Sequence, residues 1–484
     1  MRNPWPHVLI AAAVLLSLAS EPAVAADPAL RLLLKKGIIT QEEHDQALQE
    51  TGQAEAAPPA KAKAAVPVTD DPKGVTFGYD RGLYAQAGDR FRLKIGIRLQ
   101  ARFTDSRFNA AYNTVGDAKN YPGVSAAGVI SATKHAEDLA FFSMHSARLV
   151  FEGFAFSPNS QYFVQFRNDT NSSTRQPGAT RSTTQLYDAY LTLTQIPWAN
   201  LRVGQYRTHF GRQAFTPEMQ LQFVDRGFVS GAFVPSGLDR RDQGITMFSD
   251  QATYPINYAV GVFNGVGINL NRLGLSTPGN ANELMYVGRI TADVLGKPGY
   301  AEGDLVASPT PHLAVGVSYG YNGGLQTNTT GAGSNNQIST ALASRGNGRL
   351  LNQGIVDIGT GGLDAIVKYK GFSLQAEGFV RNIDTHDHSR RIGNATGYYA
   401  QGGYFVLPGQ LEVVGRWSAM DPDTRAAQDL LTSGVGGLNW YVNGHEHKMQ
   451  LDYGVITTRL SAADAGGAVS LRENRFRLQY TIAF

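Results

Sequence analysis

The sequence predicts an all-β protein: a transmembrane antiparallel β-barrel of about 16 strands, preceded by a short helical segment in the periplasm. From residue 91 to the end, apolar and polar side chains alternate with a period of two. Long and short connections alternate between these segments along the chain. Charged residues make up 17% of the chain, against roughly 25% in an ordinary soluble domain.

Composition excludes several classes of site. The chain has 484 residues and no cysteine, which rules out disulfides, cysteine zinc sites, iron–sulfur clusters and thiol catalysis. The formal net charge is +3, too balanced to indicate nucleic-acid binding. We therefore expect no nucleic-acid partner, and no motif indicates a cofactor or a metal.

The N-terminus has the pattern of an export signal. Arg2 is followed by the apolar run Val8–Ala19, which is too short to span a bilayer comfortably, and then by the small residues Ala23-Val-Ala25. We expect residues 1–25 to be a cleaved signal peptide, with an uncleaved anchor as the alternative. No apolar run long enough for a transmembrane helix follows.

Residues 26–73 have the pattern of a short helical segment and a linker. A leucine-rich stretch ends at Gly37, and Thr40-Gln-Glu-Glu43 is typical of a helix start. Residues 51–73 are rich in Ala, Pro and Lys, as linkers are. The segment is either a periplasmic interaction or oligomerisation element or a poorly ordered leader. The barrel domain is expected to cover 74–484.

The first and last strands show the alternation most clearly. In Phe91–Phe103 the odd positions are apolar, whereas the even positions include Arg92, Lys94, Arg98 and Arg102. In 475–484 the apolar side chains alternate with Arg475 and Arg477. Because successive side chains of a strand point to opposite faces, each of these two strands has one apolar and one basic face.

Weaker segments of the same kind lie between these two. They are expected near 145–156, 160–169, 185–194, 200–209, 243–250, 254–263, 283–294, 312–322, 362–370, 371–381, 395–407, 409–419, 434–443 and 447–457. Most have about 10 residues, the length that a tilted strand needs to cross a bilayer. The connections after odd-numbered strands are long, and the others are short except for 295–311. Outer-membrane barrels separate long loops from short turns in this way.

Lipid contact requires the apolar faces to point outward, so the basic faces line the lumen. An arginine on the lipid face near the membrane midplane would cost roughly 2–4 kcal/mol. Since the first and last strands are neighbours in a closed barrel, their charges form one basic wall, and within these two segments no acid alternates with them. Such a wall favours anions. The alternative for any single arginine is a structural ion pair with a lumen acid.

The third long connection, about 210–242, is a candidate for a loop that folds into the pore. Its apolar side chains could pack against the wall, and arginines lie in and beside it. The residues expected to line the pore or bind anions are Arg92, Lys94, Arg98, Arg102, Arg148, Arg202, Arg207, Arg212, Arg226, Arg475 and Arg477. An external loop is the alternative.

Four stretches resemble the phosphate-selective porin family of O and P type: Phe91–Gln100, Arg148–Gly153, Leu201–Gly211 and Gly397–Gln401. Lys94, Arg98 and Arg148 match basic positions in the strands of that family. The resemblance implies a 16-stranded outer-membrane channel, a homotrimer, that passes small anions such as phosphate. Ala214 and Met219 stand near the place where phosphate-specific members have lysines, and the fifth connection offers only Arg345 and Arg349 for their arginine ladder.

We therefore expect a porin for passive diffusion of small anions, such as phosphate or polyphosphate, exported to the bacterial outer membrane and in contact with its lipid. The alternatives are a weakly selective general porin and a plugged structural barrel. An enzyme is not expected. Gly316-Val-Ser-Tyr-Gly320 has the spacing of a nucleophile elbow but lies in an alternating segment rather than at a strand-to-helix turn.

Overall fold

The computed structural model describes residues 74–108, 113–114, 130–131, 138–168, 184–236, 240–270, 283–326, 354–425, 429–462 and 467–484. All of them belong to one compact unit, Val68–Phe484. The signal peptide expected at 1–25 and the segment expected at 26–73 lie outside the described residues and stay predictions.

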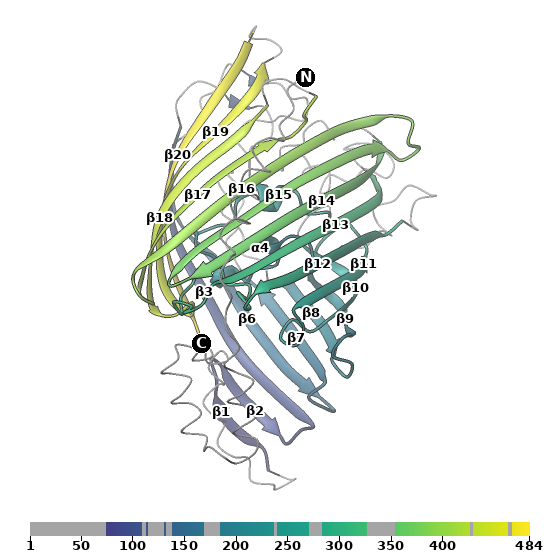
Figure 1. Ribbon diagram of the computed structural model, residues 1–484, viewed down its shortest axis with the longest axis vertical. Helices are drawn as coiled ribbons and strands as arrows, with labels where there is room; N and C mark the ends of the chain where they lie inside the picture. Colours follow the sequence, from purple (N-terminus) through teal and green to yellow (C-terminus); the bar gives the residue numbers. More distant parts are fainter. Residues whose placement is uncertain are drawn as a thin grey trace. The chain divides into compact units, whose positions relative to one another are not determined.

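Sixteen antiparallel strands close into a barrel (Figure 1). In chain order they are β3 (Phe91–Phe108), β6 (Leu139–Ala155), β7 (Ser160–Arg167), β8 (Gln185–Leu193), β9 (Asn200–Arg207), β10 (Arg241–Phe248), β11 (Ile256–Phe263), β12 (Met285–Leu295), β13 (His312–Gln326), β14 (Ile355–Tyr369), β15 (Phe372–Thr385), β16 (Arg391–Leu407), β17 (Leu411–Asp421), β18 (Leu431–Asn443), β19 (His447–Ala462) and β20 (Gly467–Ala483). Each strand pairs with the next, and β20 pairs with β3, where Tyr480 stands opposite Ala101. Closure leaves these strands without a free edge, as hydrocarbon requires.

Every strand expected from the alternation is present, and the predicted barrel is confirmed. The short segment expected at 243–250 is β10, which pairs with β9 on one side and with β11 on the other. Several strands are longer than expected, because their ladders continue into the connections. β3, for example, runs to Phe108, and β20 begins at Gly467.

The two faces of the strands differ as a lipid-embedded barrel requires. Large apolar side chains are exposed on the outer face, among them Leu191 at 61% and Trp440 at 54%. Charged side chains are buried on the inner face, among them Arg289 at 4% and Lys448 at 0%. This is the reverse of the usual distribution in a soluble protein. Among the described residues, no helix is both long enough and apolar enough to span a membrane.

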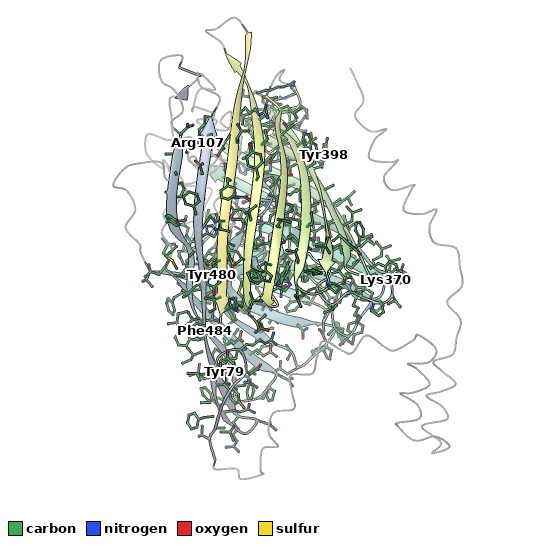
Figure 2. The ribbon with its side chains drawn as sticks, turned by 90° about the vertical axis from the view of Figure 1, so that its left-hand side faces the viewer. Tyr79, Arg107, Lys370, Tyr398, Tyr480 and Phe484 are labelled. Atoms are coloured by element: carbon green, nitrogen blue, oxygen red, sulfur yellow. The ribbon has the colours of Figure 1, made fainter. Side chains whose placement is uncertain are left out.

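The two ends of the barrel carry different connections. One end, which we call the short-turn end, has tight turns such as Lys370-Gly371, where both residues have positive φ, as a two-residue hairpin turn requires. The other end has the long loops, and the first of these contains a two-residue pairing of β4 (Asn113–Thr114) with β5 (Ile130–Ser131). Figure 2 places Arg107 toward the long-loop end and Phe484 toward the short-turn end.

A hairpin that the alternation did not predict lies at the short-turn end. Its strands are β1 (Thr76–Tyr79) and β2 (Leu83–Ala87). Leu83 of β2 pairs with Ile95 of β3, whereas β20 pairs with β3 from Arg98 onward. The hairpin therefore continues the sheet along β3 beyond the end of β20 (Figure 1).

Candidate functional site

The connection between β9 and β10 folds into the barrel. It contains α4 (Arg212–Phe215), the 3₁₀ turn η1 (Glu218–Gln220) and α5 (Phe228–Ala232). We call its described residues, 208–236 and 240, the inward loop. Its backbone is bonded to inner faces around the barrel: the Gly211 amide donates to Ser318 of β13, and Lys448 of β19 donates to the Leu221 carbonyl at 2.8 Å. The loop expected to enter the pore does so.

Apolar packing holds one part of the inward loop. Phe210, Val229 and Phe233 are fully buried in a cluster with Phe379 and Tyr399 of the barrel wall. The rings of Phe233 and Phe379 stack with centroids 5.5 Å apart. An irregular segment inside a barrel has no ladder partners, so packing of this kind fixes its position.

Ion pairs with the barrel seam hold another part. Arg102 of β3 donates to both carboxylate oxygens of Asp225 at 3.0 Å, and Arg477 of β20 donates to the same carboxylate at 2.5 Å. Burial raises the pKa of Asp225, but the charges of the two arginines outweigh it, so the pKa lies below its usual value. Arg477 also pairs with Asp452 of β19 at 2.7 Å.

Arg148 of β6 provides a further anchor. Its guanidinium pairs with Glu218 of the 3₁₀ turn. His145, on the same strand, lies 3.2 Å from Glu218 and 3.6 Å from Asp225. Glu218 and Asp225 therefore connect the inward loop to the β3–β6 wall.

The connection of residues 296–311 enters the lumen from the short-turn end. Glu302 is 1% exposed and accepts hydrogen bonds from the Gln213 side chain at 2.8 Å and the Gln222 amide at 2.7 Å. Arg212 donates to the Gly299 carbonyl, and Lys368 of β14 donates to the Pro298 carbonyl at 2.8 Å. This connection is longer than the other turns at its end because it packs against the inward loop.

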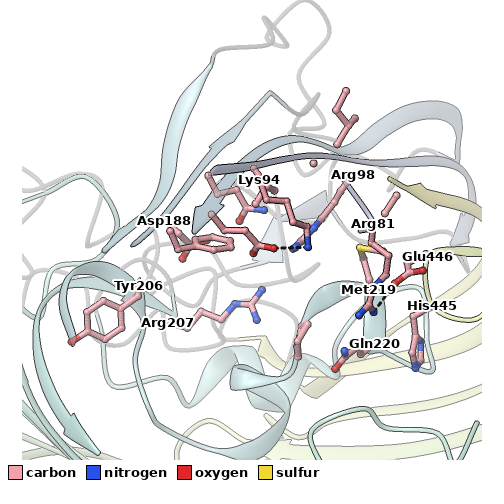
Figure 3. A pocket seen from close by; sticks show the side chains of 18 of the residues that line it. Arg81, Lys94, Arg98, Asp188, Tyr206, Arg207, Met219, Gln220, His445 and Glu446 are labelled. Atoms are coloured by element: carbon pink, nitrogen blue, oxygen red, sulfur yellow. Dashed lines mark hydrogen bonds and ion pairs between the residues drawn. The ribbon is translucent and has the colours of Figure 1, made fainter. Parts of the chain in front are cut away.

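A cavity of about 670 Å³ remains between the inward loop and the wall formed by β3 and β6–β9. We call it the chamber. It extends to the short-turn end, where Arg81 and Glu446 line it (Figure 3). Phe484 lines the same end. Its charged lining residues are Arg81, Lys94, Arg98, Arg202, Arg207, Arg241, Glu152, Asp188 and Glu446.

The chamber has more cations than carboxylates, six against three. Three cations pair with the three acids: Lys94 with Glu152 at 2.8 Å, Arg241 with Asp188 at 2.8 Å, and Arg81 with Glu446 at 3.0 Å. Arg98, Arg202 and Arg207 remain as the excess of three positive charges.

The three excess arginines are positioned without a carboxylate partner among the described residues. Arg202 donates to Thr192 Oγ1 at 3.1 Å and lies over the Tyr190 ring, 4.4 Å from its centroid. Arg207 donates to the carbonyls of Phe215 and Thr216 at 3.1 Å. The side chain of Arg98, opposite Arg148 in the ladder, makes no hydrogen bond or ion pair with a described residue. These positive charges are therefore not neutralised by a paired acid.

His445, in the β18–β19 turn, also lines the chamber. Burial is the main cause that lowers the pKa of His445 to about 3, and the charges of Lys448 and Lys368 lower it further. The imidazole is therefore neutral at pH 7 and leaves the charge balance of the chamber unchanged.

Only some of the residues expected to line the pore lie together in the chamber. Lys94, Arg98, Arg202 and Arg207 line the chamber. Arg102, Arg148 and Arg477 hold the inward loop. The remaining expected residues lie elsewhere, each with its own partners: Arg92 with Asp80, Arg475 with Glu473, Arg226 with the Gln213 and Thr216 carbonyls, and Arg212 with Gln375 and Gly299.

Apart from Arg98, the basic side chains expected to form a wall at the seam are paired with acids. Asp225 comes from the inward loop, Asp452 from β19, and Glu473 from the part of β20 that lies before the expected strand. Asp225 and Glu473 lie outside the two alternating segments and were not predicted as partners, whereas the Arg477–Asp452 pair is the structural ion pair with a lumen acid that stood as the alternative.

Tyr187 and Gln165 were also missed. The guanidinium groups of Arg148, Arg167 and Arg241 lie 4.5, 4.7 and 3.5 Å from the centroid of the Tyr187 ring. Gln165 is 2% exposed and lines the chamber. No group of His, Cys, Asp and Glu that could hold a metal ion occurs in the described part of the chain.

Solved structures of similar fold include porins. An anion-selective porin from Comamonas acidovorans is 9% identical, with 81% of this chain and 99% of that chain covered and a TM-score of 0.50. The outer membrane channel DcaP of Acinetobacter baumannii is 12% identical, with 81% and 97% covered and a TM-score of 0.47. At such low identity the first likeness shows the fold alone. A search of curated protein sequences finds no significant match.

A model of one protein family matches most of the chain. It is the family described as phosphate-selective porin O and P, and the match covers residues 125–482. The match includes 15 of the 16 barrel strands, β6 to β20, and the whole inward loop. The resemblance seen in the sequence is confirmed, and the chain belongs to the phosphate-selective porin O and P family.

Proposed function

We propose that the barrel is an outer-membrane channel through which small anions, phosphate or polyphosphate among them, diffuse passively. The chief support is the chamber, where Arg98, Arg202 and Arg207 have no carboxylate partner among the described residues. Unpaired positive charge in a narrow aqueous space with low-dielectric walls attracts anions and repels cations.

The family and the fold point to a channel rather than an enzyme. They also point to the bacterial outer membrane, where barrels place their short turns on the periplasmic side. In the proposed orientation the chamber is a periplasmic vestibule below the inward loop. Export by the 1–25 signal peptide, a role of 26–73 in the periplasm and assembly as a homotrimer belong to the same proposal.

Current through single channels in a planar bilayer tests this function. In a KCl gradient the reversal potential is expected to shift from zero toward the equilibrium potential of chloride. Phosphate added to the bath should reduce the chloride current if phosphate enters the same path. A reversal potential shifted toward the equilibrium potential of potassium would contradict the proposal.

Replacement of the excess arginines should weaken the selectivity. For Arg98→Gln or Arg202→Gln, loss of about 1 kcal/mol of Coulomb attraction in a water-filled lumen would lower the chloride-to-potassium permeability ratio roughly fivefold. Arg90→Gln is the matched control, because Arg90 is exposed at the β2–β3 turn and does not line the chamber. Equal ratios in all variants would exclude the chamber as the source of selectivity.

A plugged structural barrel is the second candidate. The inward loop and residues 296–311 both enter the lumen and bond to each other through Glu302. A barrel closed by these two segments would give no current in the same bilayer experiment, whereas the proposed channel gives discrete steps.

A further inference from the structure

The chamber is large for an inorganic ion. Its volume of about 670 Å³ falls within the roughly 300–1,000 Å³ of pockets that enclose small organic ligands. Phosphate has five heavy atoms and would leave most of this space to water. Size therefore favours an anion with an organic body.

The lining of the chamber includes donors that lack acceptors. Gln165 Nε2 and Arg207 Nε are buried and make no hydrogen bond with any described residue. The Arg98 side chain has no bonded partner among the same residues. Buried donors are nearly always satisfied in native proteins, so orphaned ones call for an acceptor from elsewhere. An anionic group with two oxygens, such as a carboxylate, can accept from several of them.

Aromatic and apolar side chains also line the chamber. The rings of Phe163 and Tyr190 are stacked, with centroids 5.2 Å apart and planes 15° apart. On the inward loop Phe215 packs on Tyr300 with centroids 5.0 Å apart, and Met219 is also part of the lining. Contact with such surfaces lowers the free energy of a flat aromatic ring. Inorganic phosphate gains nothing from them and loses its hydration.

We propose that the chamber is a binding site for a small aromatic carboxylate, with the carboxylate at Arg98, Arg207 and Gln165 and the ring against Phe163. This proposal rests on the proposed function, because it names the substrate class that the anion channel prefers. Tyr190 positions a further cation of the chamber, since Arg202 lies over its ring.

Block of the chloride current by three anions tests this proposal. Benzoate, acetate and phosphate are added separately to both sides of the bilayer, and the concentration that halves the current is measured for each. Benzoate is expected to act at a concentration at least about tenfold lower than acetate, since about 1.4 kcal/mol from burial of the ring corresponds to a factor of ten. If acetate or phosphate halved the current at the same concentration as benzoate, the proposal would be overturned.

Two variants separate the carboxylate contact from the ring contact. Phe163→Leu should weaken block by benzoate several-fold and leave block by acetate unchanged, because acetate has no ring. Gln165→Leu should weaken block by both. Gln161→Leu, the same change at an exposed position on the same strand, should alter neither. Equal loss for benzoate and acetate in Phe163→Leu would contradict a ring site.

The reversal potential distinguishes failure of this proposal from failure of the proposed function. An anion-selective channel in which benzoate is no better than acetate refutes the aromatic site alone. A cation-selective channel, or no current at all, refutes the anion channel and the aromatic site together. The comparison of anions on the unaltered protein stands even if a variant fails to fold.

Discussion

At the scale of single residues, Asp188 limits the positive charge of the chamber. Its carboxylate accepts from Arg241 at 2.8 and 3.1 Å. Asp188→Asn keeps the shape and removes the negative charge, so the excess of cations rises from three to four. We predict that the reversal potential in a KCl gradient moves further toward the chloride side, with a permeability ratio several-fold higher, since the change equals about 1 kcal/mol.

The control is Asp89→Asn, because Asp89 is exposed at the β2–β3 turn and does not line the chamber. This variant should behave as the unaltered protein does. A shift toward potassium in Asp188→Asn would mean that the carboxylate positions Arg241 for anion passage, and the count of charges would then be the wrong explanation.

Individual basic residues of the lumen are predictable from the sequence more readily than their roles. The alternation placed Lys94, Arg98 and Arg202 on the inner face, and they line the chamber. It could not distinguish them from Arg102, which binds Asp225, a residue 123 positions away in the chain. Whether an arginine is paired depends on such distant contacts, which local alternation does not encode.

At the scale of elements, the inward loop depends on its apolar anchor. Phe233 is 1% exposed and stacks on Phe379. Loss of a buried phenyl ring costs about 3–5 kcal/mol, which acts here on the attachment of the loop rather than on the barrel ladders. We predict that Phe233→Ala gives larger, noisier single-channel currents, because the loop moves away from the wall.

Phe156→Ala provides the comparison for this variant. Phe156 is 91% exposed in the β6–β7 turn, and its loss should leave the currents unchanged. If Phe233→Ala conducts with the steady current of the unaltered protein, polar contacts such as those of Asp225 and Glu302 hold the loop without the ring.

The elements themselves were largely predictable, because a strand between lipid and water must alternate along its whole length. Two features were not. The β1–β2 hairpin is short, and it adds to the sheet only through β3. The 296–311 connection has no alternation, and its burial follows from contacts of Glu302 with a loop about 80 residues earlier.

At the scale of the whole molecule, the account rests on a barrel whose outer face meets lipid and whose inner face meets water. Adjacent residues of β8 illustrate this division. Tyr190 lines the chamber, and Leu191 is 61% exposed on the opposite face. The exposed apolar face would be unfavourable in water and is favourable in hydrocarbon.

Spin labels on these two neighbours test the division most directly. Because the chain has no cysteine, Tyr190→Cys and Leu191→Cys can each be labelled uniquely in the reconstituted barrel. Power saturation then compares contact with oxygen, which concentrates in lipid, and with a water-soluble nickel chelate. The account predicts that the label at 191 is accessible to oxygen and the label at 190 to the chelate. The same accessibility at both positions, or the reverse order, would contradict it.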